Sequence, residues 1–212
     1  MSAAPAARAF EVRHVQLARA FFAAIAAVMV TFSSDHSAAV GLSVFSGFAI
    51  ASGLVLLLAA WLVYPAGSRA LPVLLGVLSA AAGMIGGLPP LRSTVMFFVL
   101  VIVWALVTGL FEGIAGFRAF RRAPVHSVAR GVARDGLTVG VFGVLLALGT
   151  LLVSPQYALE YYIEDAHQSF TLTGITIAVG LFGGYAAIVA VYLAIAGFSP
   201  RRDPAPIEDG HA

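Results

Sequence analysis

One carboxylate, Glu112, interrupts an apolar stretch of membrane length in the segment TGLFEGIAGFRAFRR, residues 108–122. An ionisable group inside a membrane span is a functional hypothesis by default, because burying it near the bilayer centre costs about 3 kcal/mol. Glu112 lies about five residues from the predicted end of its span, roughly 8 Å, where that cost is smaller. Arg118, Arg121 or Arg69 at the same membrane face could pair with the carboxylate. We predict a structural anchor, with proton or ligand handling as the alternative.

A second group of polar residues lies in the segment SPQYALEYYIEDAHQSFT, residues 154–171. Within it, Glu164-x-x-His167 has the i,i+3 spacing of a carboxylate and imidazole ligand pair. A di-iron bundle would need a second such motif and two more glutamates inside the helices, and both are missing. We therefore favour a short interfacial helix whose tyrosines lie at headgroup level, with metal binding as the weaker alternative. The residues of this metal candidate are Asp35, His36, Glu160, Glu164 and His167.

Glycines spaced four residues apart give helices flat surfaces on which a neighbouring helix can pack closely. We favour packing inside one bundle, with a dimer face as the alternative. None of these motifs is a phosphate-binding loop, because each lies inside an apolar run of membrane length and the chain has no lysine. The glycines singled out for helix packing are Gly53, Gly109, Gly113, Gly180 and Gly184.

The sequence offers no set of residues for catalysis or for a cofactor. Cysteine is absent, which excludes disulfides, thiolate catalysis and cysteine metal sites. Ser34 and His36 lie in one short turn without the third group that orients a catalytic triad. No segment is long enough to build the basic soluble face that nucleic-acid binding requires. We predict a non-enzymatic protein without a cofactor.

The composition indicates which elements must position these residues. The 212 residues are 60% hydrophobic and only 10% charged, whereas soluble domains carry about 25% charged residues. A spanning helix needs about 20 apolar residues. We predict an all-α integral membrane protein with a cytoplasmic segment 1–15 and a disordered cytoplasmic tail 199–212. Its six predicted spans are 16–32, 38–64, 70–88, 93–117, 136–153 and 170–198.

The arginines predict the orientation of these spans. If the N-terminus is cytoplasmic, eleven of the twelve basic residues lie inside and only Arg92 lies outside, which is the positive-inside pattern. Both termini are then cytoplasmic, as is the arginine-rich loop 118–135. We favour topology anchoring for this loop, with binding of anionic headgroups or docking of a partner as the alternative. The inside arginines are Arg8, Arg13, Arg19, Arg69, Arg118, Arg121, Arg122, Arg130, Arg134, Arg201 and Arg202.

The even-numbered spans resemble one another. The segments SGLVLLLAA (52–60), TGLFEGIAG (108–116) and VGLFGGYAA (179–187) align without gaps and place a glycine in register. The third and fifth spans share a Gly-Val-Leu motif and each ends at a proline, Pro89 and Pro155. We predict three antiparallel hairpins, each of two consecutive spans, repeated in parallel along the chain.

This layout, and above all WALVTGLFEGIAGFRAFRR (104–122), resembles the HdeD-like short-repeat membrane proteins of bacteria. The resemblance runs from about Leu17 to Phe198. It implies six spans in the inner membrane and no established biochemical activity, and one branch of the family is linked to acid resistance. The chain departs from the family pattern in its longer outer segment, 154–171, and in its extensions at both ends.

Two functions follow as hypotheses. The first is a non-enzymatic inner-membrane protein of envelope or acid stress, or an accessory subunit that binds another membrane protein or a second copy. The second is a small transporter or channel whose pathway runs between the hairpins. A transporter places several polar groups near the bilayer midplane, and the modest candidates are Ser79, Thr108 and Thr150. Because deep polar residues are few, the sequence favours the first hypothesis.

Overall fold

The computed structural model describes residues 10–164 and 167–199. Within them the chain forms six long helices and one short β-hairpin. Each of the six helices is long and apolar enough to cross a membrane, so the prediction of six helices of membrane length is confirmed. The helices are α1 (Val12–Phe32), α2 (Ala38–Leu62), α3 (Ala70–Gly87), α4 (Thr94–Arg122), α5 (Val128–Leu151) and α6 (Gly174–Phe198).

Four of the helices begin at a side chain that caps them. The hydroxyl oxygens of Ser37, Ser93, Ser127 and Thr173 each accept a hydrogen bond from a backbone N–H in the first turn of α2, α4, α5 and α6. Such a cap satisfies a backbone donor that has no partner within the helix, and it contributes about 1 kcal/mol. The short polar connections therefore fix where the long apolar segments become helical.

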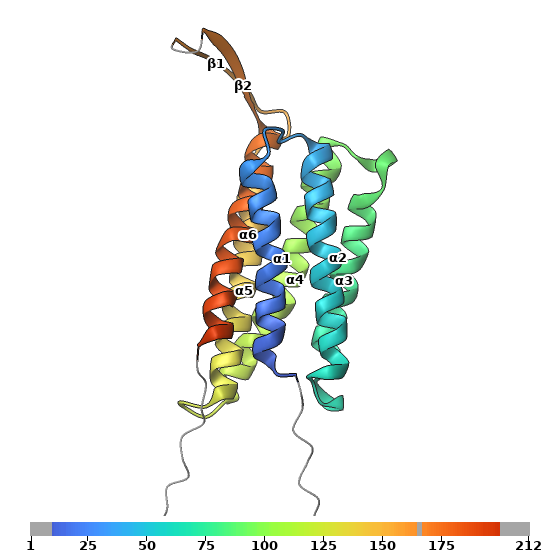
Figure 1. Ribbon diagram of the computed structural model, residues 1–212, viewed down its shortest axis with the longest axis vertical. Helices are drawn as coiled ribbons and strands as arrows, with labels where there is room; N and C mark the ends of the chain where they lie inside the picture. The colour runs from blue at the N-terminus through green and yellow to red at the C-terminus, as the bar shows by residue number, and fades with distance from the viewer. Residues whose placement is uncertain (1–9, 165–166, 200–212) are drawn as a thin grey trace, which may run out of the picture.

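The helices run antiparallel to their neighbours in the chain, which gives the bundle two distinct ends (Figure 1). α1 begins and α6 ends at the same end, where the α2–α3 and α4–α5 connections also lie. We call it the basic end because it carries Arg13, Arg69, Arg118, Arg121, Arg122, Arg130 and Arg134. The opposite end, with strands β1 (Ala158–Ile163) and β2 (Gln168–Thr173), is the hairpin end.

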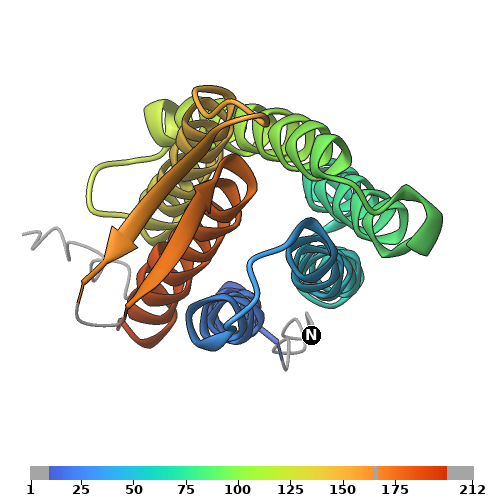
Figure 2. The ribbon, with the colours of Figure 1, turned by 90° about the horizontal axis from the view of Figure 1, so that it is seen from above.

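The most extensive helix contacts join α2 with α3, α4 with α5, and α1 with α6. Seen from above, these three pairs surround the middle of the bundle (Figure 2). The contacts of α1 with α2, α3 with α4 and α5 with α6, the pairs of the predicted hairpins, are less extensive. The tightest units therefore combine an even-numbered helix with the odd-numbered helix after it, and α6 packs back against α1.

Glycines make two of these close pairs possible. A Cβ added at Gly53 of α2 would lie 2.7 Å from the carbonyl oxygen of Gly76 in α3. A Cβ at Gly109 of α4 would lie 2.8 Å from the carbonyl oxygen of Gly140 in α5. Real side chains do not tolerate such distances to backbone atoms, so only glycine lets these helices come so close. The packing role predicted for Gly53 and Gly109 agrees with this geometry.

Other predicted packing glycines differ from these two. Gly113 lies at ordinary contact distance from α5, since an added Cβ would be 3.6 Å from the Cα of Gly140. No described atom lies within 4 Å of a Cβ added at Gly180 or Gly184. Those two glycines line an apolar groove of about 490 Å³ beside α5. They do not bring two helices of this bundle together, and the alternative of a face toward another copy stays a prediction.

Large aromatic side chains fill the centre of the bundle toward the hairpin end. Phe45 and Phe48 of α2 each make edge-to-face contacts with Trp104 of α4 and Phe182 of α6, at centroid distances of 5.2–5.7 Å. Edge-to-face aromatic pairs contribute about 1 kcal/mol beyond the area that they bury. This cluster ties α2, α4 and α6 together in the core of the bundle.

Three predictions about the connections are wrong. The segment predicted as an interfacial helix is a β-hairpin, and α6 begins at Gly174 instead of residue 170. Strand β1 pairs antiparallel with β2, with Tyr161 opposite Phe170. The predicted loop 118–135 is mostly helical, because α4 continues to Arg122 and α5 begins at Val128. The predictions for Arg8, Arg201 and Arg202, and for most of the terminal segments 1–15 and 199–212, lie outside the described residues.

Candidate functional site

The Glu112 carboxylate forms an ion pair with Arg19 of α1. The Nη1 of Arg19 donates to Oε1 of Glu112 at 2.6 Å, and Nη2 donates to Oε2 at 3.0 Å. The two side chains are 17% and 13% exposed. Two parallel bonds from one guanidinium to one carboxylate are the strongest geometry for such a pair. Glu112 lies ten residues before the end of α4, so the pair is inside the bundle and not at its surface.

This partner differs from the three predicted ones. Arg69 donates through Nε to the backbone oxygen of Tyr64 at 3.1 Å. The guanidinium of Arg121 lies over the ring of Phe117, 5.8 Å from its centroid. Arg118 is exposed and forms no ion pair with Glu112. The structural reason is that the Glu112 carboxylate meets α1 across the bundle, where both of its oxygens accept hydrogen bonds from Arg19.

A cavity of about 610 Å³ leads from the basic end to this ion pair. Exposed residues line its mouth, among them Ser68, Arg118 and Arg122. Its deeper walls are mostly apolar, and Arg19 and Glu112 line its innermost part. The apolar lining includes Val12, Val15, Leu56, Leu71, Leu75, Val139 and Leu193. A volume of this size lies within the range of roughly 300–1,000 Å³ that is typical of small-molecule sites.

A second, much smaller cavity of about 30 Å³ lies on the other side of the ion pair. Arg19 and Glu112 line both cavities, so the pair separates them. The small cavity adds the polar side chains of Ser52, Ser79, Thr108 and Tyr185. The indole Nε1 of Trp104 donates to the Ser79 hydroxyl at 3.1 Å, and the Thr108 hydroxyl donates to the Trp104 backbone oxygen at 2.6 Å. The polar lining therefore continues toward the hairpin end beyond the ion pair.

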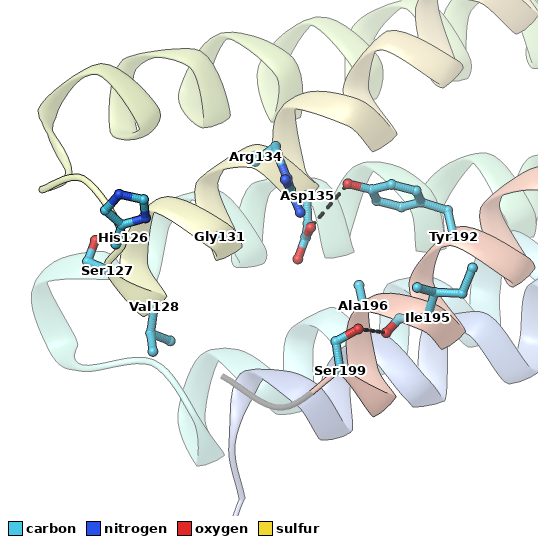
Figure 3. A pocket seen from close by; sticks show the side chains of 10 residues that line it. All are labelled: His126, Ser127, Val128, Gly131, Arg134, Asp135, Tyr192, Ile195, Ala196 and Ser199. Atoms are coloured by element: carbon cyan, nitrogen blue, oxygen red, sulfur yellow. Dashed lines mark hydrogen bonds between the residues drawn. The ribbon is translucent and has the colours of Figure 1, made fainter. Parts of the chain in front are cut away.

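Asp135 of α5 is a second acid of the large cavity and is only 3% exposed. The side-chain amide of Gln16 donates to its Oδ2 at 2.7 Å, and the Tyr192 hydroxyl donates to its Oδ1 at 3.1 Å. Figure 3 shows Asp135 and Tyr192 pointing toward each other from α5 and α6. They also line a separate pocket of about 320 Å³ that opens beside His126 and Arg134. Asp135 thus lies between two cavities at the basic end.

The amide of Gln16 is only half satisfied. Its Nε2 donates to Asp135, whereas its Oε1 is buried and has no hydrogen-bond partner among residues 10–164 and 167–199. Leaving a buried acceptor without a donor costs roughly 1–3 kcal/mol. Gln16 lines the large cavity, and its amide is held there by the bond to Asp135.

No protein-family model, curated protein or solved structure matches this chain. The HdeD-like resemblance of residues 104–122 therefore stays a prediction based on that motif. What the site does has to be inferred from its own side chains.

Arg19 was not among the predicted partners of Glu112. It was grouped with the cytoplasmic arginines that set topology, although Arg19 lies inside the predicted first span, 16–32. That position was the signal: an arginine inside an apolar span needs an acid inside the same bundle. Gln16 and Asp135 were missed as well: Gln16 was only the first residue of the predicted span 16–32, and Asp135 the last residue of the predicted loop 118–135.

The weak metal candidate at the hairpin end is not assembled. Within the described parts of the chain, no three side chains of His, Asp or Glu come together in a way that could hold a metal ion. Asp35 instead accepts hydrogen bonds from the backbone N–H of Ser37 at 2.8 Å and from its hydroxyl at 3.1 Å. Glu160 is on strand β1, and Glu164 and His167 belong to the turn of the hairpin. His36 likewise joins no such cluster.

Proposed function

We propose that this chain is a small membrane transporter that binds its substrate beside the Arg19–Glu112 pair. The observation that carries the proposal is that every helix contributes a polar side chain to the two adjoining cavities. These side chains are Arg19 of α1, Ser52 of α2, Ser79 of α3, Glu112 of α4, Asp135 of α5 and Tyr185 of α6.

A purely structural anchor would not require this arrangement. One ion pair between α1 and α4 is enough to fix two helices, and apolar packing could surround it. Here the pair instead lies between a cavity of about 610 Å³ and a polar pocket of about 30 Å³. Transporters place binding sites near the bilayer midplane, between helices whose polar groups face a cavity. Ser79 supports such a depth, since it is nine residues from the start of the 18-residue helix α3.

The clustering of polar side chains around the two cavities favours the transporter hypothesis. Deep polar residues are few, and this scarcity favoured an accessory protein of envelope or acid stress. That hypothesis, together with the HdeD-like type, the inner-membrane location, the cytoplasmic termini and the absence of enzymatic activity, stays a prediction. The parallel repeat stays a proposal too. It is supported by the packing of each even-numbered helix against the next odd-numbered one, with α6 against α1.

The chain contains no cysteine, so single cysteines can report which side of the membrane reaches the site, without knowledge of a substrate. In a transporter, Ala115→Cys in the large cavity should react with a charged methanethiosulfonate reagent added at the basic end. Ser79→Cys, beyond the ion pair, should react with reagent added at the hairpin end in the fraction of molecules that open there. Val99→Cys is the matched control, because Val99 is an exposed apolar residue on the outer surface of α4 and should not react from either side.

Two outcomes would contradict transport. In the first, Ser79→Cys reacts only from the basic end under all conditions, which would make the cavity a one-sided pocket. In the second, liposomes that contain the protein show no flux above empty vesicles with pH- and ion-sensitive dyes. A positive flux should disappear in the Glu112→Ala variant, since that change removes one of the two charged side chains of the proposed binding site.

A further inference from the structure

We infer that the large cavity binds a small organic carboxylate on Arg19, and that Glu112 occupies this position until it takes up a proton. The inference rests on the proposed function only in assigning binding to the same cavity. It adds the class of ligand and the coupling of its binding to one proton.

The ion pair itself shows what Arg19 recognises. Its two terminal nitrogens meet the two oxygens of one carboxylate at 2.6 and 3.0 Å. A planar guanidinium with two parallel donors matches a carboxylate better than it matches a chloride ion or a single hydroxyl. Both partners line the large cavity, so a carboxylate that enters from the basic end reaches the guanidinium from the side already open to it.

The walls indicate what the rest of the ligand is. Between the mouth and Arg19 the cavity is lined by Val15, Leu56, Leu71, Leu75 and Val139. These side chains offer no hydrogen bonds, and Gln16 and Asp135, which also line the cavity, bond to each other and to Tyr192. A sugar or a peptide would therefore lose most of its hydration there without compensation. An apolar body attached to one acid group suits the walls and the guanidinium together. Exposed Arg118 and Arg122 at the mouth attract such an anion from solution.

Charge balance requires the proton. Arg19 and Glu112 together carry no net charge, so a ligand carboxylate would add a negative charge to a mostly apolar bundle that already holds Asp135 in the same cavity. Burying an uncompensated charge is costly. If the Glu112 carboxylate takes up a proton from solvent, it releases Arg19, and the ligand carboxylate replaces it with no change in the net charge of the site.

The other groups that face the pair do not take this role. Asp135 on α5 bonds to Gln16 and Tyr192, whereas the Arg19 guanidinium bonds to Glu112, so a proton on Asp135 would not release Arg19. Burial raises the pKa of Tyr64, which follows α2, so its phenol stays neutral. Tyr185 of α6 is likewise a phenol, and Arg118 and Arg122 of α4 remain cationic. Neither α3 nor the rest of α1 contributes a titratable side chain to either cavity.

Calorimetric titration of the detergent-solubilised full chain with benzoate tests the inference directly. Benzoate combines one carboxylate with an apolar ring and stays ionised from about pH 5.5 to about pH 8. Repeating the titration in two buffers with different ionisation enthalpies counts the protons taken up. We expect one proton to be taken up for each benzoate bound, so that the affinity falls as the pH rises, by about tenfold for each pH unit. Cyclohexylamine, a cation of similar size, should not bind.

Three variants test which residue takes up the proton and which residue binds the carboxylate. Glu112→Gln should bind benzoate without proton uptake, and more tightly than the natural chain near neutral pH, because the internal competitor is gone. Arg19→Gln should lose benzoate binding at every pH. Glu11→Gln is the matched control, since Glu11 is an exposed acid at the start of α1, the helix that carries Arg19, and lies outside both cavities. This variant should bind benzoate as the natural chain does.

Glu112→Gln leaves Arg19 without its anion and lowers stability, so the variant is also measured by thermal unfolding. Benzoate should raise its melting temperature more than it raises that of the natural chain at the same pH. Benzoate binding without proton uptake in the natural chain would overturn the inference. So would loss of the uptake in Asp135→Asn instead of Glu112→Gln, or no binding of benzoate at all. These results are independent of transport, which is decided by the accessibility of Ser79→Cys from the hairpin end.

Discussion

At the scale of single residues, Arg19 and Glu112 explain each other. A guanidinium inside an apolar helix and a carboxylate inside another are each costly alone, and together they form two short hydrogen bonds. Lysine could not replace Arg19 with the same geometry, because an ammonium group binds one oxygen at a time and is more strongly hydrated. The pair is therefore a specific contact between α1 and α4, in addition to whatever ligand it serves.

A double-mutant cycle should measure the coupling free energy between Arg19 and Glu112. Arg19→Gln and Glu112→Gln should each lower the free energy of unfolding by about 3 kcal/mol, because each leaves one buried charge without its partner. The double variant should lose much less than the sum of the two. Arg118→Ala is the control, and its effect should add to that of Glu112→Gln within about 0.5 kcal/mol. Coupling to Arg118 instead of Arg19, measured by unfolding in detergent, would contradict the structure.

At the scale of helices and strands, the apolar runs predicted the six helices well, because membrane length and composition leave few other structures. The residues at which the helices begin and end were harder to predict. Arginines after residue 117 were taken to end the fourth span, but arginine is a good helix former and α4 continues to Arg122. The hairpin was missed because the i,i+3 spacing of Glu164 and His167 suggested a helical turn. The alternation of Leu159, Tyr161 and Ile163 was the contrary signal.

The glycines of the helix pairs give a prediction at the same scale. Gly109→Ala should destabilise the bundle by roughly 1–3 kcal/mol, because the new methyl group would lie 2.8 Å from the Gly140 carbonyl oxygen and α4 and α5 would have to separate. Gly180→Ala is the matched control. Since nothing described lies within 4 Å of its added Cβ, the change should be neutral or stabilise α6 by up to about 1 kcal/mol. The measurement is thermal unfolding of both variants in the same detergent.

Equal destabilisation by the two alanines would mean that Gly180 packs against something outside this chain. A second copy would be the first partner to test, by comparing the oligomeric state of Gly180→Ala with that of the natural chain. Destabilisation by neither alanine would contradict the close approach of α4 and α5.

At the scale of the whole molecule, the site is a product of helix packing that no local pattern encodes. Arg19 and Glu112 are 93 positions apart, and Gln16 and Asp135 are 119 positions apart. Periodicity within one helix indicates which face is apolar, but it does not say which helix lies opposite. The prediction of three hairpins suggested neighbours along the chain, whereas α1 packs most extensively against α6. Glu112 was predicted as a candidate, and its surroundings could come only from the assembled bundle.

The distribution of charge predicts on which side of the membrane the basic end and the hairpin end of the bundle lie. The described arginines other than Arg19 and Arg92 lie at the basic end, and the exposed acids Glu160 and Glu164 lie on the hairpin at the other. The positive-inside rule therefore predicts a cytoplasmic basic end. In intact cells, a membrane-impermeant maleimide should label Glu160→Cys, whereas Val125→Cys, in the exposed α4–α5 connection, should react only after the membrane is permeabilised. Labelling of Val125→Cys in intact cells without labelling of Glu160→Cys would invert the orientation, and the large cavity would then open to the outside.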